Sequence, residues 1–273
     1  MDASQIETLT AQLLGEIASR RPLVQNITNY VSMDIAANAL LAIGASPVMV
    51  FAPEESPELS PHIDALVVNT GTLSKAAAEA MDVAARAASA NTKPWLLDPV
   101  GAGGLTLRNE TVKTLAASKP SIIRGNASEI IAVARILGLT RNAARPRGVD
   151  STSQSADAEA SALALARHCA CTVAATGAID IVTDGAQTVR LANGDAIMTR
   201  VTALGCSLSS VMGAFLGVAP KPLDAAIGAL ALYGVAADIA LPQSRGPASF
   251  RVAFLDMLAN IRAADFAGRI RTS

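Results

Sequence analysis

The chain has 273 residues, of which 51% are hydrophobic and only 3% aromatic, and its formal net charge is −1. A chain of this length and composition can bury a large core of Ala, Val, Leu and Ile side chains. The near-zero charge excludes a basic stripe for nucleic acid and a polybasic face for anionic lipid, so any bound phosphate must be held by local geometry.

The sequence also indicates the cellular compartment in which the protein works. Residues 1–7 are polar and acidic, which does not fit a secretory signal. One long uncharged run, residues 201–219, is interrupted by glycines, and we interpret it as a buried helix with its lead-in and not as a membrane span. Three cysteines, an odd number, favour a reducing compartment. We therefore expect a cytoplasmic protein that uses neither membrane nor nucleic acid.

The cluster His168-Cys169-Ala170-Cys171 has the residue types of a metal site. The only other histidine is His62, so no second ligand pair exists and structural cysteines are the favoured interpretation.

The chain begins with a helical pattern over residues 4–18, followed by the polar run 25–30 and a second helix from about Ser32, which Gly44 ends. The amides and hydroxyls of the polar run can cap this helix or point into a cleft. Helix capping explains one of these polar side chains but not all five.

Apolar strand patterns then alternate with helical ones, which is the signature of βαβ units around a parallel sheet buried on both faces. The strands are predicted at 46–50, 65–69, 95–99, 121–124 and 171–176, and the helices at 74–90, 107–117, 127–137 and 156–168. Residues 179–183 and 188–191, with turns at 184–185 and 193–194, predict an antiparallel hairpin region, so the sheet is mixed. Helices at 208–218, 223–239 and 248–261 close a single domain, residues 1–273, in which the polar segment 141–155 is expected to be a loop.

Each predicted strand ends in polar or glycine residues, where doubly wound sheets bind ligands. These ends supply Asp98 and Glu129 for a hydrated Mg²⁺, Arg124 for phosphate oxygens, and Gly205 with the following helix start for developing negative charge. That set suits phosphoryl transfer. The simpler alternatives are a surface carboxylate for Asp98, a helix-capping Glu129 behind Asn126, and a solvent-facing Arg124.

Residues 198–217 form the stretch around which the rest of the chain is organised. A β-prone run, residues 197–202, meets the turn Ala203-Leu204-Gly205 and then a helix whose first free N–H groups suit an anion. Cys206 stands on the first helical turn, where the same field is expected to lower its pKa. The alternative is a glycine turn with a small buried cysteine.

Several other chemistries fit less well. No G-x-x-x-x-G-K-[ST] motif occurs, which counts against a P-loop enzyme, and no G-x-G-x-x-G follows the first strand pattern, which counts against a dinucleotide oxidoreductase. Neither histidine lies beside a predicted strand end, so a Ser-His or Cys-His nucleophile is disfavoured.

A set of motifs is spread over nearly the whole chain. In chain order they are Q-N-I-T-N at 25–29, A-A-N at 36–38, G-A-S-P-V-M at 44–49, N-T-G-T-L at 69–73, L-D-P-V at 97–100, I-R-G-N-A-S-E-I at 123–130, G-V-D-S at 148–151 and G-P-A-S-F at 246–250. Together they resemble the hydroxyethylthiazole kinase family of the ribokinase-like superfamily. The resemblance implies a three-layer α/β/α fold with a mostly parallel central sheet and an antiparallel edge. It further implies ATP- and Mg²⁺-dependent phosphorylation of 4-methyl-5-(2-hydroxyethyl)thiazole, a thiamine salvage step, by a homotrimer with active sites at subunit interfaces.

The same resemblance suggests roles for single residues. It implies that Met49, Asn26, Gly71 and Ala203 contact the thiazole, that Arg124, Thr176 and Asn126 bind ATP, and that Asp98 and Glu129 order Mg²⁺ largely through water. Cys206 takes the position of the Asp that acts as base in related sugar kinases, and with Gly205 it is the catalytic candidate.

Two departures from the family pattern concern the anion turn and the nucleotide. Ala203-Leu204 replaces a common Gly-Thr, and Thr176-Gly177-Ala178 replaces a common T-G-E. Two other functions therefore stay open: a ribokinase-like dehydratase of hydrated nicotinamide nucleotides, and a trimer that binds ATP and thiazole without turnover.

Overall fold

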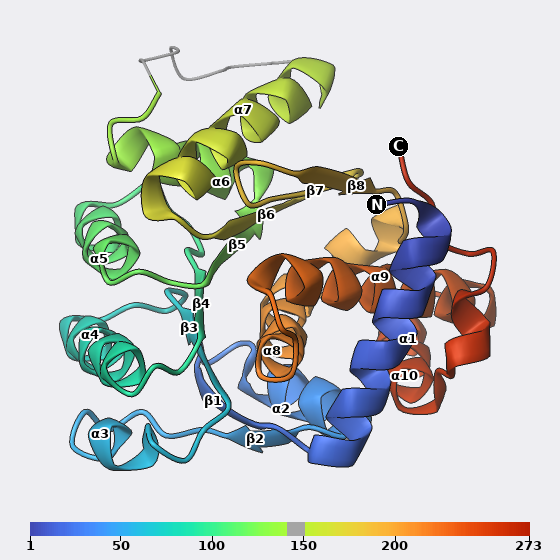
Figure 1. Ribbon diagram of the computed structural model, residues 1–273, viewed down its shortest axis with the longest axis horizontal. Coiled ribbons are helices and arrows are strands. Elements are labelled where there is room, and N and C mark those ends of the chain that lie inside the picture. Colours follow the sequence, from blue (N-terminus) through green and yellow to red (C-terminus); the bar gives the residue numbers. More distant parts are fainter. Residues whose placement is uncertain (141–150) are drawn as a thin grey trace.

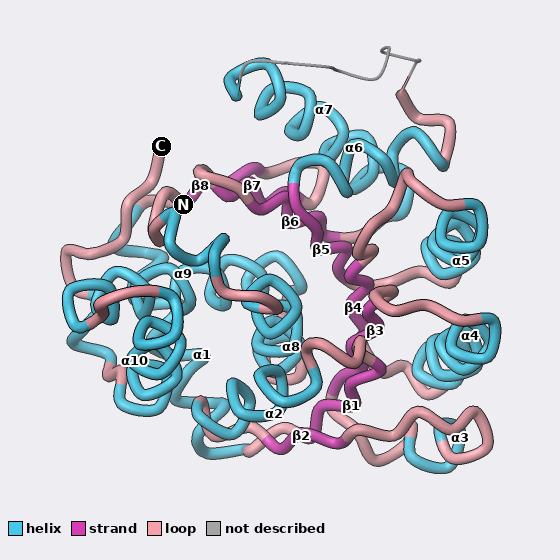
Figure 2. The backbone as a smooth tube through the Cα atoms, turned by 180° about the vertical axis from the view of Figure 1, so that it is seen from behind, coloured by secondary structure: helices cyan, strands magenta, loops and turns pink. Residues whose placement is uncertain are grey.

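A computed structural model describes residues 1–140 and 151–273, and for residues 151–155 it describes the backbone alone. Its centre is an eight-stranded sheet of order β2-β1-β3-β4-β5-β6-β7-β8 (Figures 1 and 2). The strands are β1 (Leu23–Ile27), β2 (Ser46–Val48), β3 (Ala65–Asn69), β4 (Trp95–Asp98), β5 (Ile122–Asn126), β6 (Thr172–Thr176), β7 (Asp180–Thr183) and β8 (Thr188–Leu191). The first six strands pair in parallel, and β7 and β8 add an antiparallel edge.

Helices cover both faces of this sheet, as Figure 2 shows with the sheet seen edge-on. On one face lie α3 (Ser56–Leu59), α4 (Lys75–Ala90), α5 (Thr106–Ala117), α6 (Ala127–Ile136) and α7 (Ser151–Cys169). On the other lie α1 (Ala3–Arg20), α2 (Met33–Ala42), α8 (Leu204–Leu216), α9 (Pro222–Ala240) and α10 (Pro247–Asn260). The predicted three-layer fold with a mostly parallel sheet is confirmed.

The six strands β1 and β3 to β7 are largely buried because each contributes to two cores at once. Successive side chains of a strand point to opposite faces, so Val67 of β3 joins the core under α1, α2, α8 and α9, while Val68 joins the core under α4 to α7. Every residue of β3 is buried. Both cores consist mainly of aliphatic side chains, as the composition predicted.

The apolar helix α9 forms the centre of the second layer. With the short 3₁₀ turn that follows it, residues 222–243, it is the one helix among the described residues that is long and apolar enough to cross a membrane by length and composition. In this structure 78% of its apolar stretch is buried against the rest of the molecule. Its hydrophobicity is accounted for by its contacts with α1, α8 and α10.

The structure corrects three predictions of local structure. Residues 197–202 are not a strand, because the side chain of Asp195 caps a 3₁₀ helix, Ala196–Arg200, by accepting the N–H of Ile197. The helix predicted from 208 begins at Leu204, so Leu204 and Gly205 belong to its first turn. The predicted loop 141–155 is partly wrong, since α7 begins at Ser151; residues 141–150 lie outside the described part of the chain.

A fourth correction concerns β1, which the sequence pattern did not predict. Gln25 and Asn26 interrupt its apolar run, yet both side chains are buried with hydrogen-bond partners. The amide of Gln25 donates to the carbonyl of Val50 and to the hydroxyl of Ser56. These partners come from distant residues, which a local pattern does not contain.

Candidate functional site

The carboxyl ends of β4, β5 and β6 and the beginning of α8 surround a cavity of about 750 Å³. Eight of the candidate residues line it: Asp98, Arg124, Asn126, Glu129, Thr176, Ala203, Gly205 and Cys206. They come from four segments that are far apart in the sequence. The parallel sheet brings them together because its strands all end at this edge.

Arg124 of β5 connects three of these segments. Its guanidinium donates through Nη1 to the carbonyl of Gly205 at 2.8 Å and through Nη2 to the hydroxyl of Thr176 at 2.7 Å. The side chain is only 8% exposed, so the solvent-facing alternative is wrong. A Cβ at Gly205 would lie 3.1 Å from Nη1, so the close approach of helix and guanidinium favours glycine. The Nε–H is also buried and has no partner among the described residues.

Asp98 at the end of β4 is fully buried, which rules out the surface alternative. Its Oδ2 accepts hydrogen bonds of 2.7 Å from both Asn69 and Ser209 and lies 3.9 Å from Nη1 of Arg124. Its Oδ1 is buried and has no partner in the part of the chain that the structure describes. Burial raises the pKa of Asp98 to about 6, against the opposing effect of the Arg124 charge.

Two asparagines link this carboxylate to Cys206. The amide of Asn29 donates to Oδ1 of Asn69 at 2.9 Å and to the sulfur of Cys206 at 3.4 Å, and Asn69 donates in turn to Asp98. The pKa of Cys206 is raised, first by burial and then by the charge of Asp98. The expected lowering by the helix field is therefore wrong, because the sequence shows neither the burial of the thiol nor the carboxylate beside it.

Glu129 and Asn126 form the capping box at the start of α6. The Asn126 side chain accepts the N–H of Glu129 at 3.0 Å, and Oε2 of Glu129 accepts the N–H of Asn126 at 2.8 Å. Oε1 of Glu129 accepts the N–H of Gly101 at 3.0 Å. The capping alternative is confirmed, and both carboxylate oxygens already have backbone partners.

The residues present fit a Mg²⁺ ion that is held mainly by phosphate and water. Among residues 1–140 and 151–273, no group of three or more His, Cys, Asp or Glu side chains could hold a metal ion. The free Oδ1 of Asp98 offers one strong acceptor, and Glu129 has lone pairs left for an intervening water. Mg²⁺ commonly keeps several waters and one or two carboxylates beside substrate phosphates.

The first turn of α8 presents N–H groups to the cavity. Ala203 precedes the helix with φ 64°, and the first helical bond runs from the N–H of Ser207 to the carbonyl of Ala203. The N–H groups of Leu204, Gly205 and Cys206 therefore have no acceptor within the helix. They stand at its positive end, which suits the oxygens of a transferred phosphoryl group.

Two residues lining the cavity were missed from the sequence. Tyr233 of α9 is buried, and its hydroxyl contacts the carbonyl of Leu204 at 3.0 Å and the hydroxyl of Ser207 at 2.6 Å, which fixes the first turn of α8. A single phenol in the middle of a helix whose other polar residues, Asp224 and Asp238, lie near its ends was the available signal. Asp180 begins β7, accepts the N–H of Gly177, and has its pKa raised by burial to about 6. Ala178 stands where the common T-G-E motif has a glutamate, but Asp180 still supplies a carboxylate to this wall of the cavity.

Three candidate substrate residues lie outside this cavity. Asn26 is buried in β1 and donates to the carbonyl of Val24, and Met49 follows β2 near the edge of the sheet. Gly71 packs directly against Asn29, because a Cβ there would lie 2.7 Å from the Cβ of Asn29. Asn26 belongs to β1, Met49 follows β2 and Gly71 follows β3, so they lie at the β2-β1-β3 side of the sheet and away from β5 and β6.

Comparison with known proteins agrees with this geometry. A sequence profile of the hydroxyethylthiazole kinase family matches residues 14–264. A hydroxyethylthiazole kinase of Rhizobium etli is 48% identical over 96% of this chain and 99% of its own length, and one of Cereibacter sphaeroides is 48% identical over 90% and 91%.

Solved structures extend the comparison to the fold. A hydroxyethylthiazole kinase structure from Pyrococcus horikoshii superposes with a TM-score of 0.89 at 36% identity, covering 97% of this chain and 98% of the other. A pyridoxal kinase of Staphylococcus aureus, with a TM-score of 0.57 and 16% identity over 79% and 87%, shares the ribokinase-like fold. By sequence over nearly its whole length and by structure, the chain belongs to the hydroxyethylthiazole kinase family.

Proposed function

We propose that the protein transfers the γ-phosphoryl group of ATP to the primary alcohol of 4-methyl-5-(2-hydroxyethyl)thiazole, with Mg²⁺ as cofactor, as a salvage step toward thiamine. The observation that carries the proposal is the convergence of Arg124, Asp98, Cys206 and the first turn of α8 on one cavity. A cation, a carboxylate and the three N–H groups of the α8 turn can position phosphate oxygens and neutralise their charge, on which phosphoryl transfer depends, and the thiol of Cys206 lines the same cavity.

In this proposal the nucleotide phosphates lie in the cavity that Arg124 and the start of α8 line together. Thr176 and Asn126 line the same cavity, and the buried Nε–H of Arg124 has no partner among the described residues. The N–H groups of the α8 turn bind the oxygens on which charge develops. Asp98 through Oδ1, and Glu129 through water, would hold Mg²⁺, which would neutralise phosphate charge there.

Cys206 lies beside the alcohol and positions it. Its raised pKa leaves most of the thiol protonated near neutral pH, so it is a poor base. Because the transition state of phosphoryl transfer is loose, the hydroxyl does not need to lose its proton early. Orientation and charge stabilisation then provide most of the rate.

The thiazole side of the site is proposed to be completed by a second protomer of a homotrimer. Met49, Asn26 and Gly71 stand beyond Cys206, and the neighbouring loop exposes Tyr30 at 77% and Val31 at 58%. Leu41 on α2 and Val252 on α10 are also largely exposed, and these two helices pack together. An apolar surface of this kind next to an unfinished site suits a subunit interface. We also propose that residues 1–273 form one domain and that the protein works in the cytoplasm.

Incubation of the purified protein with ATP, Mg²⁺ and the thiazole alcohol tests the function. We expect equimolar ADP and thiazole phosphate, and loss of product with Asp98→Asn. Binding of ATP and thiazole by calorimetry without turnover would show a binding protein, and turnover of hydrated NADH in place of the alcohol would show a dehydratase. Light scattering of the parent and of Leu41→Glu tests the trimer, which the charged residue is expected to dissociate.

A further inference from the structure

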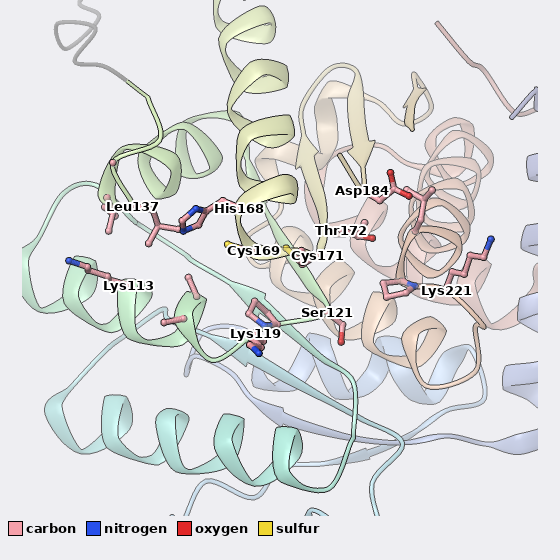
Figure 3. Close-up of a pocket in the computed structure, with 18 residues that line it drawn as sticks. Lys113, Lys119, Ser121, Leu137, His168, Cys169, Cys171, Thr172, Asp184 and Lys221 are labelled. Atoms are coloured by element: carbon pink, nitrogen blue, oxygen red, sulfur yellow. The ribbon is translucent and has the colours of Figure 1, made fainter. Parts of the chain in front are cut away.

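A second cavity, of about 1140 Å³, lies at the opposite end of the sheet (Figure 3). It is lined by Ser121 and Thr172, at the beginnings of β5 and β6. The same two strands end at Asn126 and Thr176, which line the cavity around Arg124 described above. The lengths of these strands separate the two cavities. No step of the proposed kinase reaction uses this one.

Two of the three cysteines stand in its wall. Cys169 is the last residue of α7 and is half-buried, whereas Cys171 directly precedes β6 and is buried. Ala170, with φ 51°, makes the left-handed turn between them. Figure 3 shows both sulfur atoms on the cavity side. The neighbouring thiol of Cys171 lowers the pKa of Cys169, against the opposing effect of burial.

The charges around the two thiols are mostly positive. Lys113, Lys119 and Lys221 line the cavity together with His168, and Asp184 is the one carboxylate among its described lining residues. These lysines attract anions to the cavity. The carboxyl end of α7 carries a partial negative charge that disfavours a thiolate at Cys169. The neighbouring thiol of Cys171 counters this effect of the helix end.

We propose that this cavity is a site of reversible thiol–disulfide exchange, in which an anionic low-molecular-weight disulfide binds the lysines and modifies Cys169. The Cys169 thiolate attacks one sulfur of the disulfide. A bond forms between that sulfur and Cys169, the original S–S bond breaks, and the other half leaves as a thiolate that takes a proton from water. Cys169 is oxidised to a mixed disulfide while half of the reagent is reduced to a thiol.

Cys171 determines how long the adduct lasts. Burial and the neighbouring sulfur raise its pKa, so it stays protonated and attacks the adduct slowly. The product is therefore a persistent mixed disulfide on Cys169, which a small reducing thiol removes.

The test compares two disulfides on the full-length enzyme by intact mass and peptide mapping. Glutathione disulfide is anionic, and bis(2-hydroxyethyl) disulfide is a neutral control. We expect one adduct per chain, on Cys169, formed roughly tenfold faster with the anionic reagent when the two rates are normalised to those of a free thiol peptide. Salt and a Lys113→Gln/Lys119→Gln/Lys221→Gln variant are expected to remove that difference.

Variants separate the roles of the thiols. Cys169→Ser is expected to lose the adduct and keep its kinase activity, which also shows that it folds, whereas Cys171→Ala is expected to react more slowly at Cys169. Cys206→Ser is expected to form the adduct on Cys169 at the same rate as the parent. First modification at Cys206, equal normalised rates for the two reagents, or no adduct would each overturn the proposal.

Discussion

The side chain of Asn69 donates a 2.7 Å hydrogen bond to Oδ2 of Asp98, and Ser209 donates to the same oxygen at the same distance. Both donors are neutral, and the cation of Arg124 is 3.9 Å away. One oxygen of this fully buried carboxylate is therefore held in place, whereas the other has no hydrogen-bond partner among the described residues. The arrangement favours function at a cost in stability, because a buried charge is poorly compensated by neutral donors.

The first prediction concerns the pH dependence of folding. Because the pKa of Asp98 is raised to about 6, the folded state binds a proton more tightly than the unfolded chain does. The stabilisation from this group is complete below about pH 4 and is lost as pH rises to about 6. Asp98→Asn removes this loss, and we expect it to raise the free energy of unfolding at pH 8 by up to about 3 kcal/mol while abolishing turnover.

Urea unfolding at pH 5 and pH 8 measures this effect, with Asp184→Asn as the control. Asp184 is an exposed carboxylate whose pKa is lowered by backbone hydrogen bonds, so its removal is expected to lower stability at pH 8. A destabilised Asp98→Asn at pH 8 would contradict the account of Asp98.

Ser209 is predicted to act on the reaction through Asp98. Ser209→Ala removes a hydrogen bond to a charged group, so we expect a loss of about 1.5–3 kcal/mol in stability. The pKa of Asp98 rises further, which moves the acid limb of the kcat profile to higher pH. Measured pH profiles of kcat are the readout.

Ser210→Ala is the matched control on the next residue. Ser210 is also buried, but its hydroxyl donates to the carbonyl of Cys206 in its own helix, at 3.4 Å. We expect a small stability change and an unshifted pH profile. The same shift in both variants would mean that the helix, and not the bond to Asp98, is responsible.

Arg124→Ala is predicted to weaken ATP binding by on the order of 2 kcal/mol, or about thirtyfold in Kd, because a charge-assisted contact is lost. Calorimetry with ATP measures it. The control is Arg86→Ala, whose side chain is 69% exposed and pairs with Asp82 on the same helix. Unchanged ATP affinity in the Arg124 variant would remove this residue from the nucleotide site.

The sequence predicted the parts of the fold that depend on local pattern. The run 65–69 and the capping box at Asn126 and Glu129 are decided by residues close in the chain, and both are confirmed. The edge at which polar residues gather followed from the rule for parallel strands. The order of the strands and the network through Asn29 depend on distant residues and were not predicted.

The errors have the same origin. Strand β1 was missed because the buried partners of Gln25 lie at Val50 and Ser56. The sign of the pKa shift at Cys206 was wrong because a helix start is visible in sequence, whereas burial beside Asp98 is not. In both cases tertiary surroundings outweighed the local signal.

Cys206 is predicted to assist without being indispensable. General base catalysis contributes about 10²- to 10⁴-fold, but a thiol whose pKa is raised is mostly protonated at pH 7. We therefore expect Cys206→Ala to lower kcat by less than about 100-fold and Cys206→Asp to keep measurable activity. Steady-state kinetics with the thiazole alcohol decide the matter. Complete loss of activity in both variants, with ATP still bound, would point to a required thiolate.

The last prediction concerns Ala203, which adopts φ 64° in the turn before α8. A left-handed conformation costs an L-residue about 1–2 kcal/mol, and Ala203→Gly removes that cost while increasing the entropy of the unfolded chain by a comparable amount. We expect a stability within about 1 kcal/mol of the parent. By contrast, Ala87→Gly within α4 is expected to lose about 1 kcal/mol, and Ala203→Val to be the least stable because a β-branched residue disfavours this conformation. Thermal unfolding of the three variants gives the order, and an Ala203→Val variant as stable as the parent would show that the α8 turn is not strained.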